Sequence, residues 1–294
     1  MGKIEILKKR SEILKAVREF FFDQGFFEVE TQIRSPQALP EANIELFKSE
    51  NNYLQSSPEQ YMKRLLASGS GDIFQINKAF RKNERGYLHL PEFTMLEWYR
   101  VGGDYLDLMK DCQALVFYIL KKVDLPKSIK KYFLDAKWEN LTLAQAFAKF
   151  TQSDSKKASK EGEFDFILVD QIEPNLGQNQ PCFLIDYPIE QASLAKAKKT
   201  DSGLAERFEL YVKGIELANG FSELLESEIQ RERFCKERSH SKALLEMPMP
   251  EAFLKDIAKI TKASGIALGL DRLVMVLLEL KSIDQVVAFT PEDL

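Results

Sequence analysis

Residues 74–99 read FQINKAFRKNERGYLHLPEFTMLEWY, and this stretch contains the clearest strand pair of the chain. The segments Phe74–Arg81 and Glu92–Tyr99 each alternate in character, as strands with two different faces do. The loop Lys82–Pro91 joins them, so we expect an antiparallel hairpin with an unusually long loop.

One face of this hairpin is predicted to be polar and aromatic, because residues two apart on a strand share a face. The residues that share that parity are Gln75, Asn77 and Arg81 on the first strand and Phe93, Glu97 and Tyr99 on the second. A solvated sheet face is one interpretation. A pocket for a planar base and a charged ligand is the other, and it explains why aromatic rings accompany carboxylates and an arginine.

The other predicted elements alternate between helices and strands, which indicates an α+β fold with a mostly antiparallel sheet flanked by helices. The expected helices are 6–21, ended by Gly25, then 61–67, 106–123 and 271–280. The expected strands are 26–33, 183–187, 207–217 and 266–270. Gly214 is expected to form a bulge, and Asn219-Gly220 a turn.

Two further segments carry chemistry. Glu216 and Glu223 flank the expected turn, and such a pair can bind Mg²⁺ or an ammonium group, although glutamate pairs are also common on surfaces. In residues 265–272, GIALGLDR, Asp271 is expected to be a helix N-cap. Arg272 then lies in the first helical turn, where the helix dipole disfavours a cation. An ion pair with a carboxylate, or a bound nucleotide phosphate, would compensate the positive charge of Arg272.

Composition excludes several classes of protein. The net charge of −4 weakens an interpretation based on nucleic-acid binding, and two histidines make a zinc enzyme improbable on composition. Three widely spaced cysteines show no metal or disulfide spacing. No apolar run is long enough for a membrane span or a signal peptide, so a cytoplasmic protein is expected. Walker A and dinucleotide-binding motifs are absent from the sequence, so any ATP would bind on an antiparallel sheet.

Taken together, these segments resemble the signature motifs of class II aminoacyl-tRNA synthetases. Residues 25–31, GFFEVET, resemble motif 1; residues 80–100 resemble motif 2; residues 265–272 resemble motif 3. The segments 57–66 and 216–223 are similar to the amino-acid pocket of the lysyl branch. Within that branch, residues 91–100, 191–195 and 213–220 most resemble the paralogues that attach β-lysine to elongation factor P.

The resemblance implies one catalytic domain over residues 1–294, without an anticodon-binding domain, and a homodimer. It implies ATP and Mg²⁺ as cofactors, lysine or β-lysine as substrate, and elongation factor P as the acceptor in preference to tRNA. A minimal lysyl-tRNA synthetase and a non-catalytic regulatory paralogue stay open as alternatives.

The resemblance also implies roles for individual residues. Arg81 and Arg272 would be catalytic, through the phosphates. The expected ATP-binding residues are Arg81, Asn83, Glu84, His89, Phe93, Glu216, Leu217, Gly269 and Arg272. The expected substrate-binding residues are Ser57, Glu59, Tyr99, Asn219, Glu223 and Ala267. The expected metal ligands are Glu216 and Glu223.

Four positions bear on substrate specificity, on ATP binding or on the dimer interface. Ala267 stands where the synthetases carry glycine and the β-lysine ligases alanine, and one methyl group can shift selectivity by about 1–3 kcal/mol. Three departures from the family pattern are Gln32 for the motif 1 proline, Asn83 for a glutamate that contacts adenine, and Leu90 for an asparagine. They concern the dimer interface and ATP binding.

Overall fold

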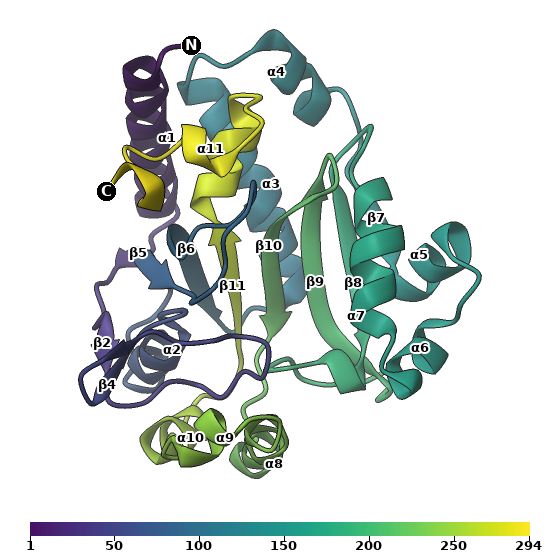
Figure 1. Ribbon diagram of the computed structural model, residues 1–294. Coiled ribbons are helices and arrows are strands. Elements are labelled where there is room, and N and C mark those ends of the chain that lie inside the picture. Colours follow the sequence, from purple (N-terminus) through teal and green to yellow (C-terminus); the bar gives the residue numbers. More distant parts are fainter.

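The computed structural model describes the whole chain, residues 1–294, except the side chain of residue 243. An eight-stranded sheet forms its centre (Figure 1). In spatial order its strands are β1 (Phe27–Glu28), β5 (Ile73–Phe80), β6 (Glu92–Val101), β11 (Ala263–Gly269), β10 (Ile215–Ser222), β9 (Leu204–Val212), β8 (Cys182–Pro188) and β7 (Glu139–Thr142). Only the outer pairs β1–β5 and β7–β8 are parallel, so the expected α+β class with a mostly antiparallel sheet is confirmed.

A small second sheet and several helices surround the large sheet. The small sheet has the order β2 (Arg34–Ser35), β4 (Asn52–Leu54), β3 (Lys48–Ser49). The helices are α1 (Lys3–Asp23), α2 (Glu59–Ala67), α3 (Tyr105–Lys122), α4 (Lys127–Leu134), α5 (Leu143–Phe150), α6 (Ser155–Glu161), α7 (Phe164–Ile167), α8 (Ser227–Arg238), α9 (Lys242–Glu246), α10 (Glu251–Ile257) and α11 (Leu270–Leu277). Among the described residues, no helix is both long and apolar enough to pass through a bilayer.

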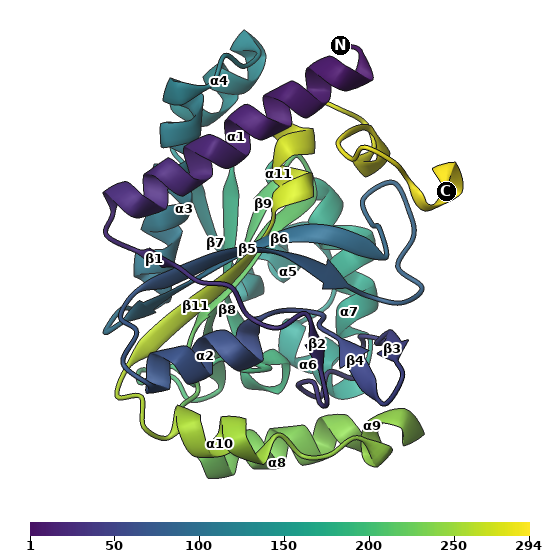
Figure 2. The ribbon, with the colours of Figure 1, turned by 90° about the vertical axis from the view of Figure 1, so that its left-hand side faces the viewer.

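The main core lies between the large sheet and the helices α1, α3 and α11, which gather on one side of it (Figures 1 and 2). Phe21 of α1 stacks on Phe74 of β5 with 4.7 Å between ring centroids, and it also contacts Trp98 of β6. Trp98 is fully buried and donates its indole N–H to Asp111 of α3 over 3.2 Å. Helices therefore cover this face of the large sheet, and only the opposite face of the sheet can line a cavity.

The predicted hairpin is confirmed: β5 and β6 pair antiparallel, with Gln75 opposite Glu97 and Ala79 opposite Phe93. The predicted strand over residues 26–33 is wrong beyond its first residues, because only Phe27 and Glu28 pair with β5. The chain then leaves the sheet, and its alternating apolar residues do not share a buried face.

The predicted turn at Asn219-Gly220 is also wrong. Both residues lie inside β10, and the turn is Lys213-Gly214, whose positive φ angles of 52° and 75° suit a two-residue hairpin. A glycine is required at position 220 for another reason: a Cβ there would lie 2.7 Å from the ring of Phe208. The register shift of this region occurs instead between Glu216 and Ala218.

The expected N-cap at Asp271 is wrong as well. Gly269 occupies the N-cap position of α11, and Asp271 lies inside the first turn. Its buried carboxylate accepts from the backbone N–H of Thr94 over 2.7 Å and pairs with Arg10 of α1 at 2.5 Å. Asp271 thus ties helices α1 and α11 to β6.

Candidate active site

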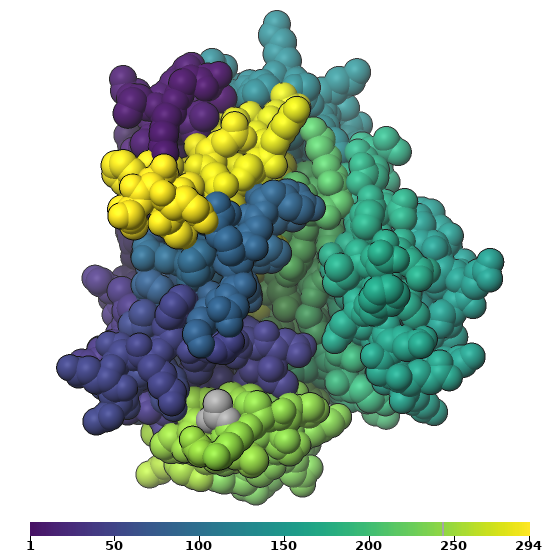
Figure 3. All heavy atoms as spheres, viewed as in Figure 1, coloured from purple at the N-terminus to yellow at the C-terminus, as the bar shows by residue number. Residues whose placement is uncertain are grey.

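A cavity of about 430 Å³ opens on the sheet face away from α1 and α3. Figure 3 shows the surface hollow between the β5–β6 loop and the green strands of the sheet. Thirteen of the predicted site residues line it: Ser57, Glu59, Arg81, Glu84, His89, Phe93, Tyr99, Glu216, Leu217, Asn219, Ala267, Gly269 and Arg272. The volume is in the range of small-molecule sites, and polar groups from several strands converge in it.

Two predicted site residues lie apart from the cavity lining. The side-chain N–H of Asn83 donates to Glu45 over 2.6 Å on the exposed β5–β6 loop. Glu223 is buried behind the lining, where its carboxylate lies 2.5 Å from the ammonium of Lys63.

Arg272 lies at one end of the cavity and already has partners on three sides. It donates to the backbone carbonyl of Glu216 over 2.9 Å and to its carboxylate over 3.2 Å, and its guanidinium lies 2.7 Å from His89 Nε2. Burial lowers the pKa of His89, and the charge of Arg272 lowers it further. His89 is therefore neutral at neutral pH, and Arg272 supplies the positive charge at this end.

Arg81 approaches the same cavity from the start of the β5–β6 loop. Its guanidinium carbon lies 5.3 Å from the ring centroid of Phe93, and its nearest carboxylate is Glu84 at 3.9 Å. The buried Nε of Arg81 has no hydrogen-bond partner among the described residues. Arg81 is thus a cation with at least one unused N–H donor, which suits it to bind an anionic group.

Carboxylates dominate the other end of the cavity. Glu97 accepts from the Ser57 hydroxyl over 2.5 Å and from the Tyr99 hydroxyl over 2.9 Å. Burial raises the pKa of Glu97 to about 8, with a further contribution from Glu59. Glu97 lies in a row that crosses the sheet, Gln75–Glu97–Ala267–Asn219, so Ala267 presents its methyl group beside this carboxylate.

Lys63 of α2 joins two of the predicted substrate residues beneath this end. Its ammonium lies 2.5 Å from both Glu59 and Glu223, and its side chain is almost fully buried. Burial opposes the charged form of Lys63, but the two carboxylates outweigh it and raise its pKa. Lys63 was not predicted as a partner of these residues, because a lysine on a predicted helix is usually solvated.

The structure separates Glu216 and Glu223, which were expected to share a metal ion. They lie at opposite ends of β10, about 20 Å apart for an extended strand, and have different cationic partners. A closer carboxylate is Glu209 of β9, whose pKa is raised by burial, with Arg207 opposing and Glu216 adding to the rise. Among the described residues, no group of three or more potential metal ligands occurs.

The carboxylates at this end of the cavity could bind Mg²⁺ only if oxygen atoms of another molecule completed its coordination. Glu216 lines the cavity, and Glu209 lies on the neighbouring strand β9, opposite Asn219 of β10, where it also pairs with Arg207 at 2.5 Å. Mg²⁺ characteristically binds one or two carboxylates together with phosphate oxygens. The pair Glu209 and Glu216 would therefore hold Mg²⁺ with a nucleotide, and Glu209 is a residue that the sequence interpretation missed.

Comparison with known proteins identifies the family of this chain. The family model for tRNA synthetases of class II (D, K and N) matches residues 3–293. A relative from Vibrio atlanticus (strain LGP32) is 38% identical, with 97% of this chain and 95% of the relative aligned. Relatives from Pectobacterium atrosepticum and Vibrio cholerae are 37% and 38% identical over 97% and 98% of this chain, and 95% and 96% of their own lengths.

All three relatives are named elongation factor P–(R)-β-lysine ligase. The resemblance that motifs 1, 2 and 3 suggested is thereby confirmed over almost the whole chain. This chain belongs to the family of class II tRNA synthetases (D, K and N).

Proposed function

We propose that this chain is an ATP-dependent ligase that activates (R)-β-lysine as its adenylate and transfers it to a lysine side chain of elongation factor P. The observation that carries the proposal is one cavity in which Arg81 and Arg272 face the carboxylates Glu59 and Glu97. The names of the relatives supply the acceptor and the β-lysine. A cytoplasmic location is part of the proposal, since the proposed acceptor takes part in translation.

The first step joins the amino acid to ATP. The substrate carboxylate attacks the α-phosphorus, the bond to the bridging oxygen breaks, and pyrophosphate leaves. Arg81 binds the substrate carboxylate and α-phosphate, while Arg272 binds the terminal phosphates. Such a reaction is accelerated by positioning and by charge neutralisation, without a protein nucleophile. Mg²⁺, held by Glu216 and Glu209, would neutralise phosphate charge when bound.

The ammonium groups of the substrate are bound at the acidic end. Glu97 is oriented by Ser57 and Tyr99, and it binds the distal ammonium with a charge-assisted hydrogen bond. Asn219 and Ala267 lie in the same row and shape the space between the two ends. In the second step, a lysine amine of the acceptor attacks the acyl carbon, an amide bond forms, and AMP leaves.

Two assays test this function. Pyrophosphate exchange is measured with ATP, Mg²⁺ and either (R)-β-lysine or lysine, and we expect exchange that is faster with (R)-β-lysine. Labelled amino acid is then offered to elongation factor P and to tRNA-Lys. We expect label in the factor only, and none in a factor whose acceptor lysine is replaced by arginine. Label in tRNA alone, or no exchange, would contradict the proposal.

A further inference from the structure

The loop between β2 and β3 forms one wall of the cavity and brings a carboxylate into it. Residues 40–44 of this loop line the cavity, with Glu41 among them. The loop is anchored to α8, because the backbone N–H of Ala42 donates to Glu237 over 2.9 Å. Glu41 is therefore held at the cavity by a defined backbone.

The carboxylate of Glu41 has no cation of its own. Among the described residues it forms no ion pair, and its one hydrogen-bond donor is the Ser56 hydroxyl at 3.5 Å. Burial raises the pKa of Glu41 to about 7, with Arg81 opposing and Glu59 and Glu237 adding to the rise. A half-buried carboxylate without a counter-ion is unfavourable in a folded protein, so a binding role explains it better than a structural one.

Other carboxylates of the cavity differ from Glu41. Glu59 pairs with Lys63, Glu84 with Arg81, and Glu216 with Arg272. Asp165 and Glu190 lie at the rim, exposed to solvent. Glu97 and Glu237 share with Glu41 the absence of an ion pair among the described residues, but Ser57 and Tyr99 donate to Glu97, and the backbone N–H of Ala42 donates to Glu237.

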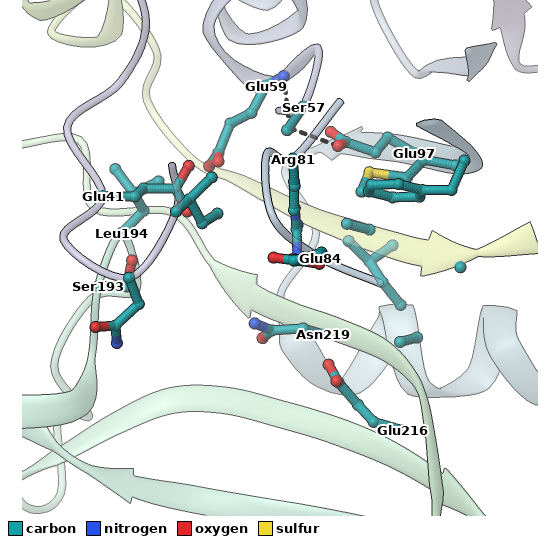
Figure 4. A pocket seen from close by; sticks show the side chains of 18 of the residues that line it. Glu41, Ser57, Glu59, Arg81, Glu84, Glu97, Ser193, Leu194, Glu216 and Asn219 are labelled. Carbon is teal, nitrogen blue, oxygen red and sulfur yellow. Dashed lines mark hydrogen bonds and ion pairs between the residues drawn. The ribbon is translucent and has the colours of Figure 1, made fainter. Parts of the chain in front are cut away.

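Glu41 and Glu97 together match the chemistry of a diamino acid, which carries two ammonium groups. Figure 4 shows Arg81 between them, with Glu41 and Glu59 on one side and Glu97 on the other. Arg81 is also the cation that acts most strongly on Glu41. A substrate whose carboxylate is bound by Arg81 would have its nearer amino group on the side of Glu41 and Glu59, and Glu59 is already paired with Lys63.

We propose that Glu41 is a specificity-determining residue whose carboxylate binds the amino group nearer to the carboxyl end of a diamino acid, while Glu97 binds the distal ammonium. This inference rests on the proposed function for the identity of the substrate. It assigns the selection of diamino acids over ω-amino acids, which lack the nearer amino group, to the β2–β3 loop, outside motifs 1, 2 and 3.

Binding of two ligands to the full chain tests the inference by calorimetry. The first ligand is (R)-β-lysine, and the second is ε-aminocaproate, which keeps the carboxylate and the distal ammonium but lacks the nearer amino group. We expect Glu41→Gln to weaken the binding of (R)-β-lysine by about 10- to 100-fold, the usual range for a charge-assisted hydrogen bond. The binding of ε-aminocaproate is expected to be unchanged.

Glu50→Gln is the matched control, because Glu50 is an exposed carboxylate of the same region that pairs with Arg34 away from the cavity. It is expected to leave both affinities unchanged. Equal losses for both ligands in Glu41→Gln, or no loss for either, would overturn the inference. Pyrophosphate exchange tests the proposed function separately: a wild-type chain that binds both ligands without exchange refutes that function and leaves the role of Glu41 standing.

Discussion

Lys63 compensates two carboxylates at the base of the cavity, since its ammonium contacts both Glu59 and Glu223. We expect Lys63→Met to lower the free energy of unfolding by about 3 kcal/mol at about pH 8, because a buried carboxylate then has no partner. Urea unfolding measures this change.

The loss is expected to depend on pH. Burial raises the pKa of Glu223 to about 8, with Lys63 opposing and Glu59 adding to the rise. Between its unfolded and folded pKa values the folded state binds more protons, so stability falls as pH rises, and removal of Lys63 steepens that fall. A loss as large at about pH 6 as at about pH 8 would contradict this account. Lys63→Met combined with Glu223→Gln should recover at least part of the stability.

The methyl group of Ala267 is a second single-residue feature, and it is expected to affect the choice between lysine and (R)-β-lysine. Ala267 lies between Glu97 and Asn219 in the row across the sheet. We expect Ala267→Gly to raise the kcat/KM for lysine relative to (R)-β-lysine by roughly 5- to 100-fold, the range for one methyl group in a pocket. Pyrophosphate exchange with each amino acid measures the ratio, and an unchanged ratio excludes Ala267 as the selector.

Among the elements, the β5–β6 loop is tied to the C-terminal segment. Arg85 donates to Glu292 over 2.9 Å and pairs with Asp284 at 3.0 Å, and the backbone N–H of Ile283 donates to the carbonyl of Tyr87 over 2.9 Å. The loop carries His89 and leads to Phe93, so its position sets the geometry of the cavity around His89, Phe93 and Arg272, where ATP is proposed to bind.

We expect Arg85→Gln to raise the KM for ATP by roughly 3- to 10-fold, about 1 kcal/mol, while the melting temperature changes little. Exposed ion pairs contribute little stability, but this one restrains a loop at the cavity. Lys78→Gln is the control, since it removes an exposed pair with Glu92 at 3.3 Å on the same hairpin. A change in melting temperature without a change in KM would assign Arg85 to stability alone.

The sequence pattern predicted the hairpin β5–β6 and helices α1, α2, α3 and α11, and the helical spacing of apolar residues in α1 reflects its one buried face. It failed at Asn219-Gly220, where local turn preference was outweighed by the close packing of Gly220 on Phe208. Parity placed Glu97 on the polar face of the hairpin, yet its pairing with Ser57 depends on an element far away in the sequence. Glu41 and Lys63 had no periodic signal, since their partners come from separate elements.

At the scale of the whole molecule, β1 forms one edge of the large sheet, next to β5 (Figure 2), and apolar side chains of the N-terminal segment around it remain exposed. Phe22, Phe27 and Ile33 are 54%, 61% and 42% exposed. Exposed apolar groups beside an unpaired sheet edge are typical of protein interfaces. We propose that this surface is the homodimer interface, with Gln32 inside it.

Sedimentation of the wild type and two variants tests this interface. We expect the wild type to be a dimer and Phe27→Asp to be a monomer that keeps its melting transition. Leu134→Asp, at a residue of α4 that is 53% exposed, is expected to stay dimeric. A dimeric Phe27→Asp variant would place the interface elsewhere.

The position of β11 between β6 and β10 has a consequence for biosynthesis. A ribosome makes all the other strands of the sheet before it makes residues 263–269, so the growing polypeptide holds two half-sheets whose inner edges have nothing to pair with. Arg272 and Ala267 arrive with that late segment. Until translation has passed α11, a nascent chain therefore lacks both the middle strand of its sheet and the Arg272 end of the cavity, and we expect chains truncated before α11 to associate through the unpaired strand edges.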